Sequence, residues 1–306
     1  MNPDNNHTTP DFRSGYVAIV GLPNAGKSTF LNCVLSEKLA IVTPKPQTTR
    51  DRIAGIYHTD AAQIIFLDTP GVCKNISKLN ERLNKEVARA LDDADLILFL
   101  VDVLRPNREA ENVLAKRIAR SEVPAYLVFN KIDEMHNLDE LMPRQVELTE
   151  LGKFENVFSI SAVKGTNTER LMEAVTRAMP PGPPYFPEDQ LSTANMRFLV
   201  AEMIREQVFL LTEKELPYAT AVVVQSFKEP DKPGGVLSIE ADVIVEKDSQ
   251  KGIIIGAKGS KLKSIGKAAR ENIEAFTESK VFLKLFVKVR KNWTRNERYL
   301  KDMGYS

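Results

Sequence analysis

The chain has 306 residues, of which 43% are hydrophobic and 27% are charged, and its formal net charge is +1. A chain of this size can form two compact domains with a hydrophobic core in each. The longest strongly apolar stretch, LILFLV at 96–101, is far shorter than the roughly 20 residues of a membrane-spanning helix, which excludes such a helix. Residues 1–15 are polar, and we expect a disordered leader there rather than a signal peptide. Cys33 and Cys73 lie far apart and have no metal-binding spacing, so we expect reduced thiols in a cytoplasmic protein.

Between residue 16 and about residue 179, short apolar runs alternate with helical stretches. The runs are continuously apolar and end in polar residues or glycine, as buried parallel strands do; they are YVAIVG, QIIFLDTPG, LILFLVDV, AYLVFNKID and NVFSISA. Helices are predicted after them at 27–36, 78–91, 108–121, 138–151 and 168–179. RIAGIYH at 52–58 is predicted to pair with QIIFLDTPG in the antiparallel sense. This order predicts a doubly wound α/β domain with a mostly parallel sheet, whose ligand binds beyond the carboxyl ends of the strands.

The segment PPGPPYFP at 180–187 ends this alternation, because five prolines in eight residues fit neither a helix nor a central strand. We therefore expect the α/β domain over 16–180, a proline-rich linker over 181–190 and an α+β domain over 191–306 that closes with a short C-terminal helix. The second domain is predicted to contain, in order, a helix, two strands, a short helix ending at Gly256, a longer helix and a last strand.

Charge is distributed unevenly along the second half. Residues 184–249 hold 6 Lys and Arg against 12 Asp and Glu, whereas residues 251–306 hold 14 against 5. The basic excess begins beside the glycine-containing stretch IIIGAKGSKL at 253–262. A charge run is usually a solvated face, but its coincidence with a glycine loop favours a polyanionic partner.

GLPNAGKST at 21–29 satisfies the pattern G-x-x-x-x-G-K-[ST], follows an apolar strand and opens a helix. Glycines allow backbone N–H groups to surround phosphate oxygens, Lys27 adds positive charge at the β- and γ-phosphates, and Ser28 offers a hydroxyl to Mg²⁺. The residues expected at the nucleotide are Gly21, Asn24, Ala25, Gly26, Lys27, Ser28 and Thr29.

Three further strand ends indicate a guanine nucleotide. In DTPG at 68–71, Asp68 is expected to hold the metal through water, and the Gly71 amide to sense the γ-phosphate. In NKID, Asn130 ties the loops together, Lys131 lies against the base, and Asp133 accepts two N–H groups that guanine has and adenine lacks. In SAVK, Ser161 begins a loop in which the Ala162 amide is expected to reach guanine O6.

The stretch TPKPQTTRDR at 43–52 lies where a loop would close over the γ-phosphate. Thr49 is expected to place its hydroxyl on Mg²⁺, with Thr48 as the second choice and an ordinary surface loop as the alternative. The residues expected to act in hydrolysis are Asn24, Lys27, Thr49, Asp68 and Gly71. Val72 stands where many small GTPases have a water-orienting glutamine, so we expect slow intrinsic turnover.

The second domain resembles a KH domain of the second topology, in which a GXXG turn between two helices clamps about four nucleotides of single-stranded RNA. Gly256, Ala257, Lys258 and Gly259 match that turn. The other residues expected at RNA are Gly252, Ile255, Lys261, Lys263, Lys267, Arg270 and Arg290. A pair of helix-capping glycines in a plain α+β domain is the alternative. Trp293 is either a core anchor, which we favour, or part of the RNA surface.

Together the five nucleotide motifs and the KH-like half resemble the Era family of bacterial ribosome-assembly GTPases, from residue 16 to the end. The resemblance implies a P-loop GTPase fold followed by a type II KH domain, with GTP or GDP and Mg²⁺ as ligands. It implies binding to the 3′ end of 16S rRNA and to the 30S subunit, a cytoplasmic location with peripheral attachment to the inner membrane, and slow GTP hydrolysis that controls RNA release. We expect a monomer. Asn24 matches a position at which related GTPases coordinate K⁺; stabilisation of the turn is the alternative role.

Two other functions are compatible with parts of this pattern. A KH protein with a passive nucleotide sensor would not need Lys27, Ser28, Thr49 and Asp68 intact. A tRNA-modifying GTPase would share Asn24 and TTRD, but would need a folate- or thiol-bearing partner domain that the C-terminal half does not show.

Overall fold

The computed structural model describes residues 12–43, 53–71, 78–213, 215–230, 232 and 234–302. By its internal contacts the chain divides into two compact units. The first comprises Met1–Glu37, Arg52–Val72 and Glu86–Thr193, and the second Lys38–Asp51, Cys73–Lys85 and Ala194–Ser306. Among the described residues, no helix is both long and apolar enough to cross a membrane.

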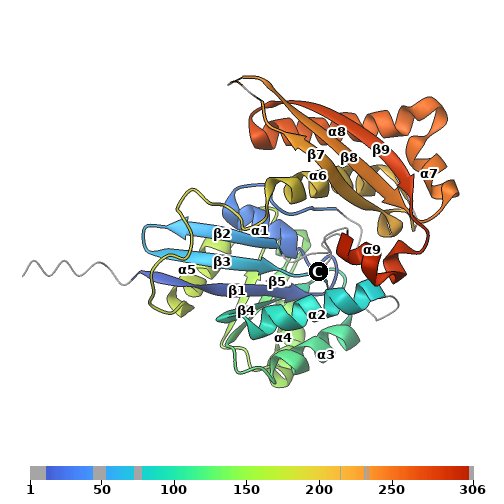
Figure 1. The fold of residues 1–306 in the computed structure, drawn as a ribbon. Helices are drawn as coiled ribbons and strands as arrows, with labels where there is room; N and C mark the ends of the chain where they lie inside the picture. The colour runs from blue at the N-terminus through green and yellow to red at the C-terminus, as the bar shows by residue number, and fades with distance from the viewer. Residues whose placement is uncertain are drawn as a thin grey trace, which may run out of the picture. The chain divides into compact units, whose positions relative to one another are not determined.

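A six-stranded sheet forms the centre of the first unit (Figure 1). Its strands are β1 (Arg13–Gly21), β2 (Ile53–Thr59), β3 (Ala62–Asp68), β4 (Leu96–Asp102), β5 (Ala125–Asn130) and β6 (Asn156–Ile160). Their spatial order is β2-β3-β1-β4-β5-β6, and only the β2–β3 pair is antiparallel. Every residue of β3, β4 and β5 is buried, because helices cover both faces of the sheet. The doubly wound, mostly parallel sheet predicted from the sequence is confirmed.

Helices pack on the two faces in the order in which the chain crosses over. They are α1 (Lys27–Leu35), α2 (Lys78–Asp92), α3 (Arg108–Ile118), α4 (Met142–Leu151) and α5 (Thr168–Ala178). One hydrophobic cluster joins alternate residues of β1, β3, β4 and β5 to α2, α3 and α4. On the opposite face, Phe30 of α1 packs edge-on against Phe66 of β3, and the Tyr126 hydroxyl of β5 donates to the Ala174 carbonyl of α5. Because β3, β1, β4, β5 and β6 are parallel, their carboxyl ends lie along one edge of the sheet. The loops that carry the predicted nucleotide motifs begin at this edge.

The proline-rich segment after α5 is attached to the sheet of the first unit. Pro181 forms an isolated bridge with Arg13, and the Ser14 hydroxyl donates to the Pro183 carbonyl. The buried Gln63 carboxamide accepts from the Tyr185 and Phe186 amides and donates to the Phe186 carbonyl. Further along the segment, Ser192 forms an isolated antiparallel bridge with Gly55 of β2. The first unit therefore extends to Thr193. Prolines suit this path because they form no regular ladder, and Gln63 supplies the polar partners instead.

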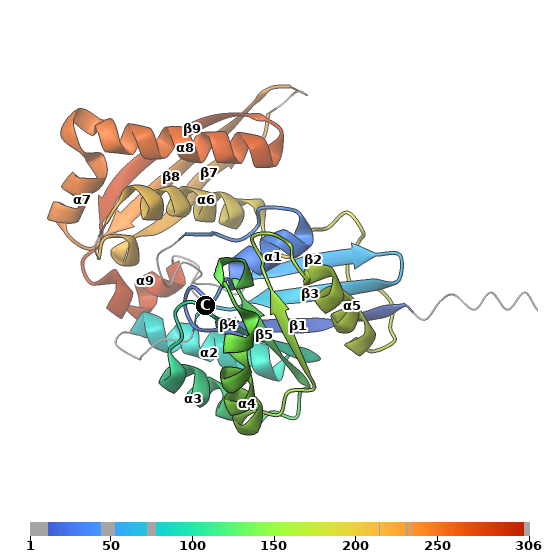
Figure 2. The same ribbon diagram turned by 180° about the vertical axis from the view of Figure 1, so that it is seen from behind.

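The second unit contains a three-stranded sheet with helices on one face (Figure 2). Its elements are α6 (Met196–Leu211), β7 (Ala221–Lys228), β8 (Val236–Val245), α7 (Asp248–Ile255), α8 (Ser260–Thr277), β9 (Lys280–Val289) and α9 (Glu297–Asp302). β7 and β8 are antiparallel, β8 and β9 are parallel, and β9 is an outer strand. Alternate residues of β8 and β9 pack against α6, α7 and α8 to form one core. This is the element order predicted for a KH domain of the second topology.

Trp293 anchors the C-terminal segment of the second unit. Its side chain is fully buried with Ala221, Ile244 and Leu300, and its indole N–H donates to the Ala219 carbonyl at 3.0 Å. A buried indole with a satisfied donor is a core residue. The favoured structural role is therefore confirmed, and the alternative RNA-contact role is wrong.

Candidate nucleotide site and nucleic-acid interface

The loop between β1 and α1 has the backbone of an anion cradle. Asn24 and Gly26 both have positive φ, at 66° and 89°, and α1 begins directly after them at Lys27. At Gly26 any larger residue would be both strained and obstructed, because its Cβ would strike the Asn130 carboxamide. Successive amide groups and the start of a helix thus face one point at the carboxyl edge of the sheet.

Lys27 is folded into this loop. Its side chain is 6% exposed, and its ammonium donates to the carbonyls of Gly21 and Leu22 at 3.2 and 3.0 Å. Burial lowers the pKa of Lys27 from 10.5 to about 8, and the Asp68 carboxylate opposes part of that change. The negative charges of a bound triphosphate would stabilise the charged form of Lys27 and so raise its pKa again.

Ser28 and Asp68 bring two hard oxygen donors together. The Ser28 hydroxyl donates to Asp68 Oδ2 at 2.7 Å, and Asp68 is fully buried at the end of β3. Mg²⁺ prefers one or two protein oxygens and keeps several waters. This donor set fits Mg²⁺.

Asn130 joins three loops at the other end of the site. Its Nδ2 donates to the Ala25 carbonyl of the phosphate loop at 2.9 Å. Its Oδ1 accepts from the amides of Lys131 and Ala162, at 2.9 and 3.0 Å. The side chain is 1% exposed, so these contacts are shielded from water. The structure therefore brings together the ends of β1, β5 and β6, as the motif order predicts.

Lys131 is held by a residue that the sequence analysis did not single out. Its ammonium lies 2.5 Å from Asp102 Oδ2, and the other Asp102 oxygen accepts from the Leu104 amide at 2.9 Å. Asp102 ends the apolar run LILFLVD, and a carboxylate at the end of a buried strand was the available signal. Lys131 itself has φ 75°, which turns the chain away from β5. Asp133 lies two residues later and is exposed, and its carboxylate has no hydrogen bond or ion pair with any described residue.

The SAVK loop is placed as expected, with one difference. Ser161 is buried, and its hydroxyl accepts from the Lys164 amide at 3.1 Å. The Ala162 amide, expected to reach guanine O6, donates instead to Asn130. Guanine would have to share that N–H with Asn130, so direct contact between Ala162 and O6 stays a prediction.

The two stretches expected to respond to the γ-phosphate are described only at their borders. Gly71 is buried against Pro23 of the phosphate loop, where an added Cβ would lie 2.7 Å from Pro23 Cα. Thr69 is fixed by a hydrogen bond from its hydroxyl to the Ile19 carbonyl, at 2.8 Å. Thr48, Thr49 and Val72 lie outside the described residues. Asn24 and Thr29 are both partly buried within the loop and the first turn of α1.

In the second unit, a tight turn separates α7 from α8. Gly256 has φ 70°, and an added Cβ would lie 2.8 Å from Lys261 Cβ, so glycine is required there. Lys258 has φ 49° and is exposed, and Gly259 has φ 78° with no atom within 4 Å of an added Cβ. The turn therefore presents Ala257 and Lys258 to solvent and leaves room for a backbone to approach at Gly259.

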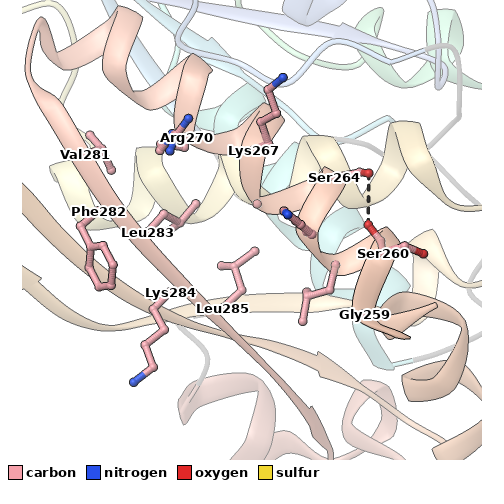
Figure 3. Close-up of a pocket in the computed structure, with 13 residues that line it drawn as sticks. Gly259, Ser260, Ser264, Lys267, Arg270, Val281, Phe282, Leu283, Lys284 and Leu285 are labelled. Atoms are coloured by element: carbon pink, nitrogen blue, oxygen red, sulfur yellow. Dashed lines mark hydrogen bonds between the residues drawn. The ribbon is translucent and has the colours of Figure 1, made fainter. Parts of the chain in front are cut away.

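A groove of about 880 Å³ runs from this turn between α8 and β9 (Figure 3). Basic side chains from α8 border it, and apolar side chains from both elements form its floor. Its lining includes Gly259, Leu262, Lys263, Lys267, Arg270, Leu283 and Leu285. Apolar walls beside a row of cations suit bases and phosphates, respectively.

The remaining predicted RNA contacts lie around the groove rather than in it. Gly252 is exposed on α7, Ile255 is partly buried beside Gly256, and Lys261 is partly buried in the first turn of α8. Arg290 does not line the groove, because its guanidinium lies 5.3 Å from the centre of the Tyr299 ring.

Two family models match the chain. The model described as "50S ribosome-binding GTPase" matches residues 16–131, and the model described as "KH domain" matches residues 215–294. GTPase Era of Geobacter metallireducens is 48% identical over 295 residues, which cover 96% of this chain and 98% of that protein. The chain belongs to the Era family of GTPases. GTPase Era of Lacticaseibacillus paracasei is 46% identical over 296 residues, covering 97% of this chain and 98% of its own.

Two solved Era structures resemble the chain over nearly its whole length. An Aquifex aeolicus Era variant bound to GDP.AlF4⁻ has 38% identity and a TM-score of 0.90, and it covers 96% of this chain and 100% of its own. Era in complex with MgGDPNP and nucleotides 1506–1542 of 16S ribosomal RNA has the same identity and TM-score, with 96% and 99% coverage. As a member of the Era family, the chain is a GTPase and carries a KH domain.

Proposed function

We propose that the chain hydrolyses GTP to time its stay on the 3′ end of 16S rRNA during assembly of the 30S ribosomal subunit. The observation that carries this proposal is one chain with two anion sites, a phosphate loop at Lys27 and a GXXG turn that opens into a basic groove. The Era complex with MgGDPNP and nucleotides 1506–1542 of 16S rRNA supports it. We assign residues 16–180 to the G domain, 181–190 to the linker and 191–306 to the KH domain.

In the G domain, each motif residue has one task. Lys27 and the loop amides bind the β- and γ-phosphates, Ser28 and Asp68 hold Mg²⁺ together with Thr49, and the Gly71 amide senses the γ-phosphate. Mg²⁺, when bound, neutralises charge on the phosphate oxygens. Asp133 selects guanine, and Asn130 and Lys131 hold the loop that carries it. Asp102 positions Lys131.

Turnover is slow because no side chain in the motifs replaces a water-orienting glutamine. Val72 follows Gly71, and its apolar side chain offers no hydrogen bond to the attacking water. Backbone groups, the loop at 43–52 or a bound partner must then orient that water.

Asn24 is our candidate ligand for a K⁺ ion at the phosphates. Its φ of 66° places it inside the turn, and a cation there would stabilise charge that develops during hydrolysis. The competing role, stabilisation of the turn alone, is supported by the same dihedral angle, since asparagine tolerates this region.

Binding of GTP at the phosphate loop and binding of RNA at the KH domain are thermodynamically coupled. If GTP and RNA each favour one arrangement of the protein, RNA must change GTP affinity by the factor by which GTP changes RNA affinity. The protein would act as a cytoplasmic monomer. Peripheral attachment to the inner membrane rests only on the basic C-terminal residues and is a separate proposal.

GTP turnover by the full chain, with and without a single-stranded RNA from the 16S 3′ end, tests the proposal. We expect RNA to change turnover in the wild type and not in Lys258→Asp or Gly256→Asp. Lys153→Asp, an equal charge change on an exposed lysine of the first unit, should behave as the wild type. An RNA effect that persists in both turn variants would contradict the coupling. Absence of any hydrolysis would favour the passive-sensor alternative.

A further inference from the structure

The outer strand β9 alternates bases and aromatic residues on one of its faces. Its odd-numbered residues point into the core, and Val281 and Val287 are buried there. Its even-numbered residues lie on the opposite face of the sheet and are all exposed. We call them the outer β9 row; they are Lys280, Phe282, Lys284, Phe286 and Lys288. Figure 3 shows Phe282 and Lys284 pointing away from α8, whereas Leu283 and Leu285 point toward it.

The two phenylalanine rings of this row are left uncovered by the neighbouring strand. Phe282 is 57% exposed and Phe286 is 39% exposed. In the parallel register, Phe282 lies opposite Ser238 and Phe286 opposite Asp242, neither of which can cover a ring. Single exposed apolar residues are common, but two aromatic rings on one face of a strand, with one lysine between them, form a surface that water solvates poorly.

Two lysines of the row, Lys284 between the rings and Lys288 beyond Phe286, are held by acidic partners on β8. The Lys284 ammonium lies 4.8 Å from the centre of the Phe286 ring and 3.6 Å from Glu240. The Lys288 ammonium lies 2.7 Å from Asp242, whose side chain is buried. Each of these pairs carries no net charge, so β8 adds no net negative charge beside the rings. Lys280, at its start, has no ion pair with any described residue.

Single-stranded nucleic acid fits this combination better than a protein does. Bases of any sequence stack on aromatic rings, and the ammonium of Lys280, which no described acid pairs, can attract a phosphate beside Phe282. Phe282 and Phe286 are four residues apart, about 13 Å along the strand, so each ring can stack a different base of an extended strand. The row is also continuous with the groove, since Phe282 and Lys284 belong to the groove lining as well. A strand that leaves the groove across β9 would meet Phe282 first.

We propose that the outer β9 row is a second RNA-binding platform, on which nucleotides beyond those clamped at the GXXG turn stack on Phe282 and Phe286. This inference rests on the proposed RNA-binding function and extends it to a longer single strand. The turn clamps about four nucleotides. The platform therefore contributes only to RNA that is longer than that.

The test compares two RNAs on the full chain, a tetranucleotide from the 16S 3′ end and an RNA of about twelve nucleotides with that tetranucleotide in its middle. The double variant Phe282→Leu/Phe286→Leu keeps the apolar bulk and removes the rings. It should bind the longer RNA about 5- to 150-fold more weakly for each ring that stacks, and should bind the tetranucleotide as the wild type does. Phe282→Trp should retain full affinity for both. Tyr185→Leu, which removes a similarly exposed ring from the first unit, should change neither affinity.

Several results would overturn the platform. Unchanged affinity of the double variant for the longer RNA would do so, as would an equal loss for both RNAs. Unchanged RNA affinity with weakened binding to the 30S subunit would make the row a protein-docking surface instead. A wild-type chain that binds neither RNA would defeat the proposed function itself. Matching thermal unfolding of wild type and double variant confirms that the fold is intact.

Discussion

Replacement of Lys27 by methionine should separate two effects of this residue, its contribution to nucleotide binding and the free energy of unfolding that is lost by burying its charge. Methionine has a similar length and no charge, so it fills the same buried space in the phosphate loop. We expect the variant to lose nucleotide binding and, without nucleotide, to be more stable than the wild type at pH 7.

The expected magnitude comes from the pKa of the buried amine. A decrease from 10.5 to about 8 corresponds to about 3 kcal/mol of lost stability at pH 7, at 1.36 kcal/mol per pKa unit. Methionine also loses two hydrogen bonds to the Gly21 and Leu22 carbonyls, about 1 kcal/mol each. The net gain is about 1 kcal/mol, or about 2–4 °C in the unfolding midpoint of a domain of this size.

The sign of the difference depends on pH. The folded-state pKa of Lys27 lies below its unfolded value, so the penalty is full below about pH 8 and fades between about pH 8 and 10.5. At pH 10 only about 1 kcal/mol of penalty remains, and the two lost hydrogen bonds then dominate. The variant should be more stable than the wild type at pH 7 and less stable at pH 10.

Thermal unfolding at both pH values, with and without GDP and Mg²⁺, measures these effects. At one hundred times its Kd, GDP should stabilise the wild type by about 2.7 kcal/mol and leave the variant unchanged. Lys116→Met, at an exposed position of α3, should change stability by no more than about 0.5 kcal/mol at either pH. A variant that is less stable at pH 7, or that GDP still stabilises fully, would refute the reasoning.

Three further predictions concern selectivity, the monovalent cation and the core. Asp133→Asn should weaken GTP binding by about 10- to 100-fold and strengthen binding of xanthosine triphosphate, measured by titration, whereas Glu134→Gln should do neither. Turnover should be faster in potassium chloride than in sodium chloride at equal ionic strength, and Asn24→Gly, which keeps the positive φ, should remove that difference; equal rates in the wild type would eliminate the K⁺ ligand. Trp293→Ala should lower the free energy of unfolding of the second unit by about 3–5 kcal/mol in urea titrations, and a loss below 1 kcal/mol would contradict its role as an anchor.

The sheet of the first unit was predictable because each parallel strand is a continuous apolar run that ends at a motif. The boundaries of individual helices and strands were less predictable than the sheet itself. Residues 138–151 were expected to form one helix, but Leu138–Leu141 form a 3-10 turn and α4 begins at Met142. Pro143 explains this start, because proline fits the first turn of a helix and not its interior.

The motif residues of the site were predictable from spacing, whereas their mutual contacts were not. The role of Asp102 could not be predicted from local spacing, because its partner Lys131 is 29 residues away. Only the parallel register of β4 and β5, which pairs Asp102 with Asn130, brings the two side chains together. The hydrogen bond from Ala162 to Asn130 depends in the same way on where β6 ends beside β5. Tertiary pairing of this kind leaves no local pattern in the sequence.

The central claim, that one chain binds guanine nucleotide and RNA at separate sites, is tested most directly by titrating a labelled 16S 3′-end RNA into the full chain. We predict that the RNA binds with an affinity that differs between the protein loaded with a non-hydrolysable GTP analogue and the protein loaded with GDP, and that Lys258→Asp weakens binding in both states. RNA binding that is absent in both states, or that is equal in wild type and Lys258→Asp, would contradict the account.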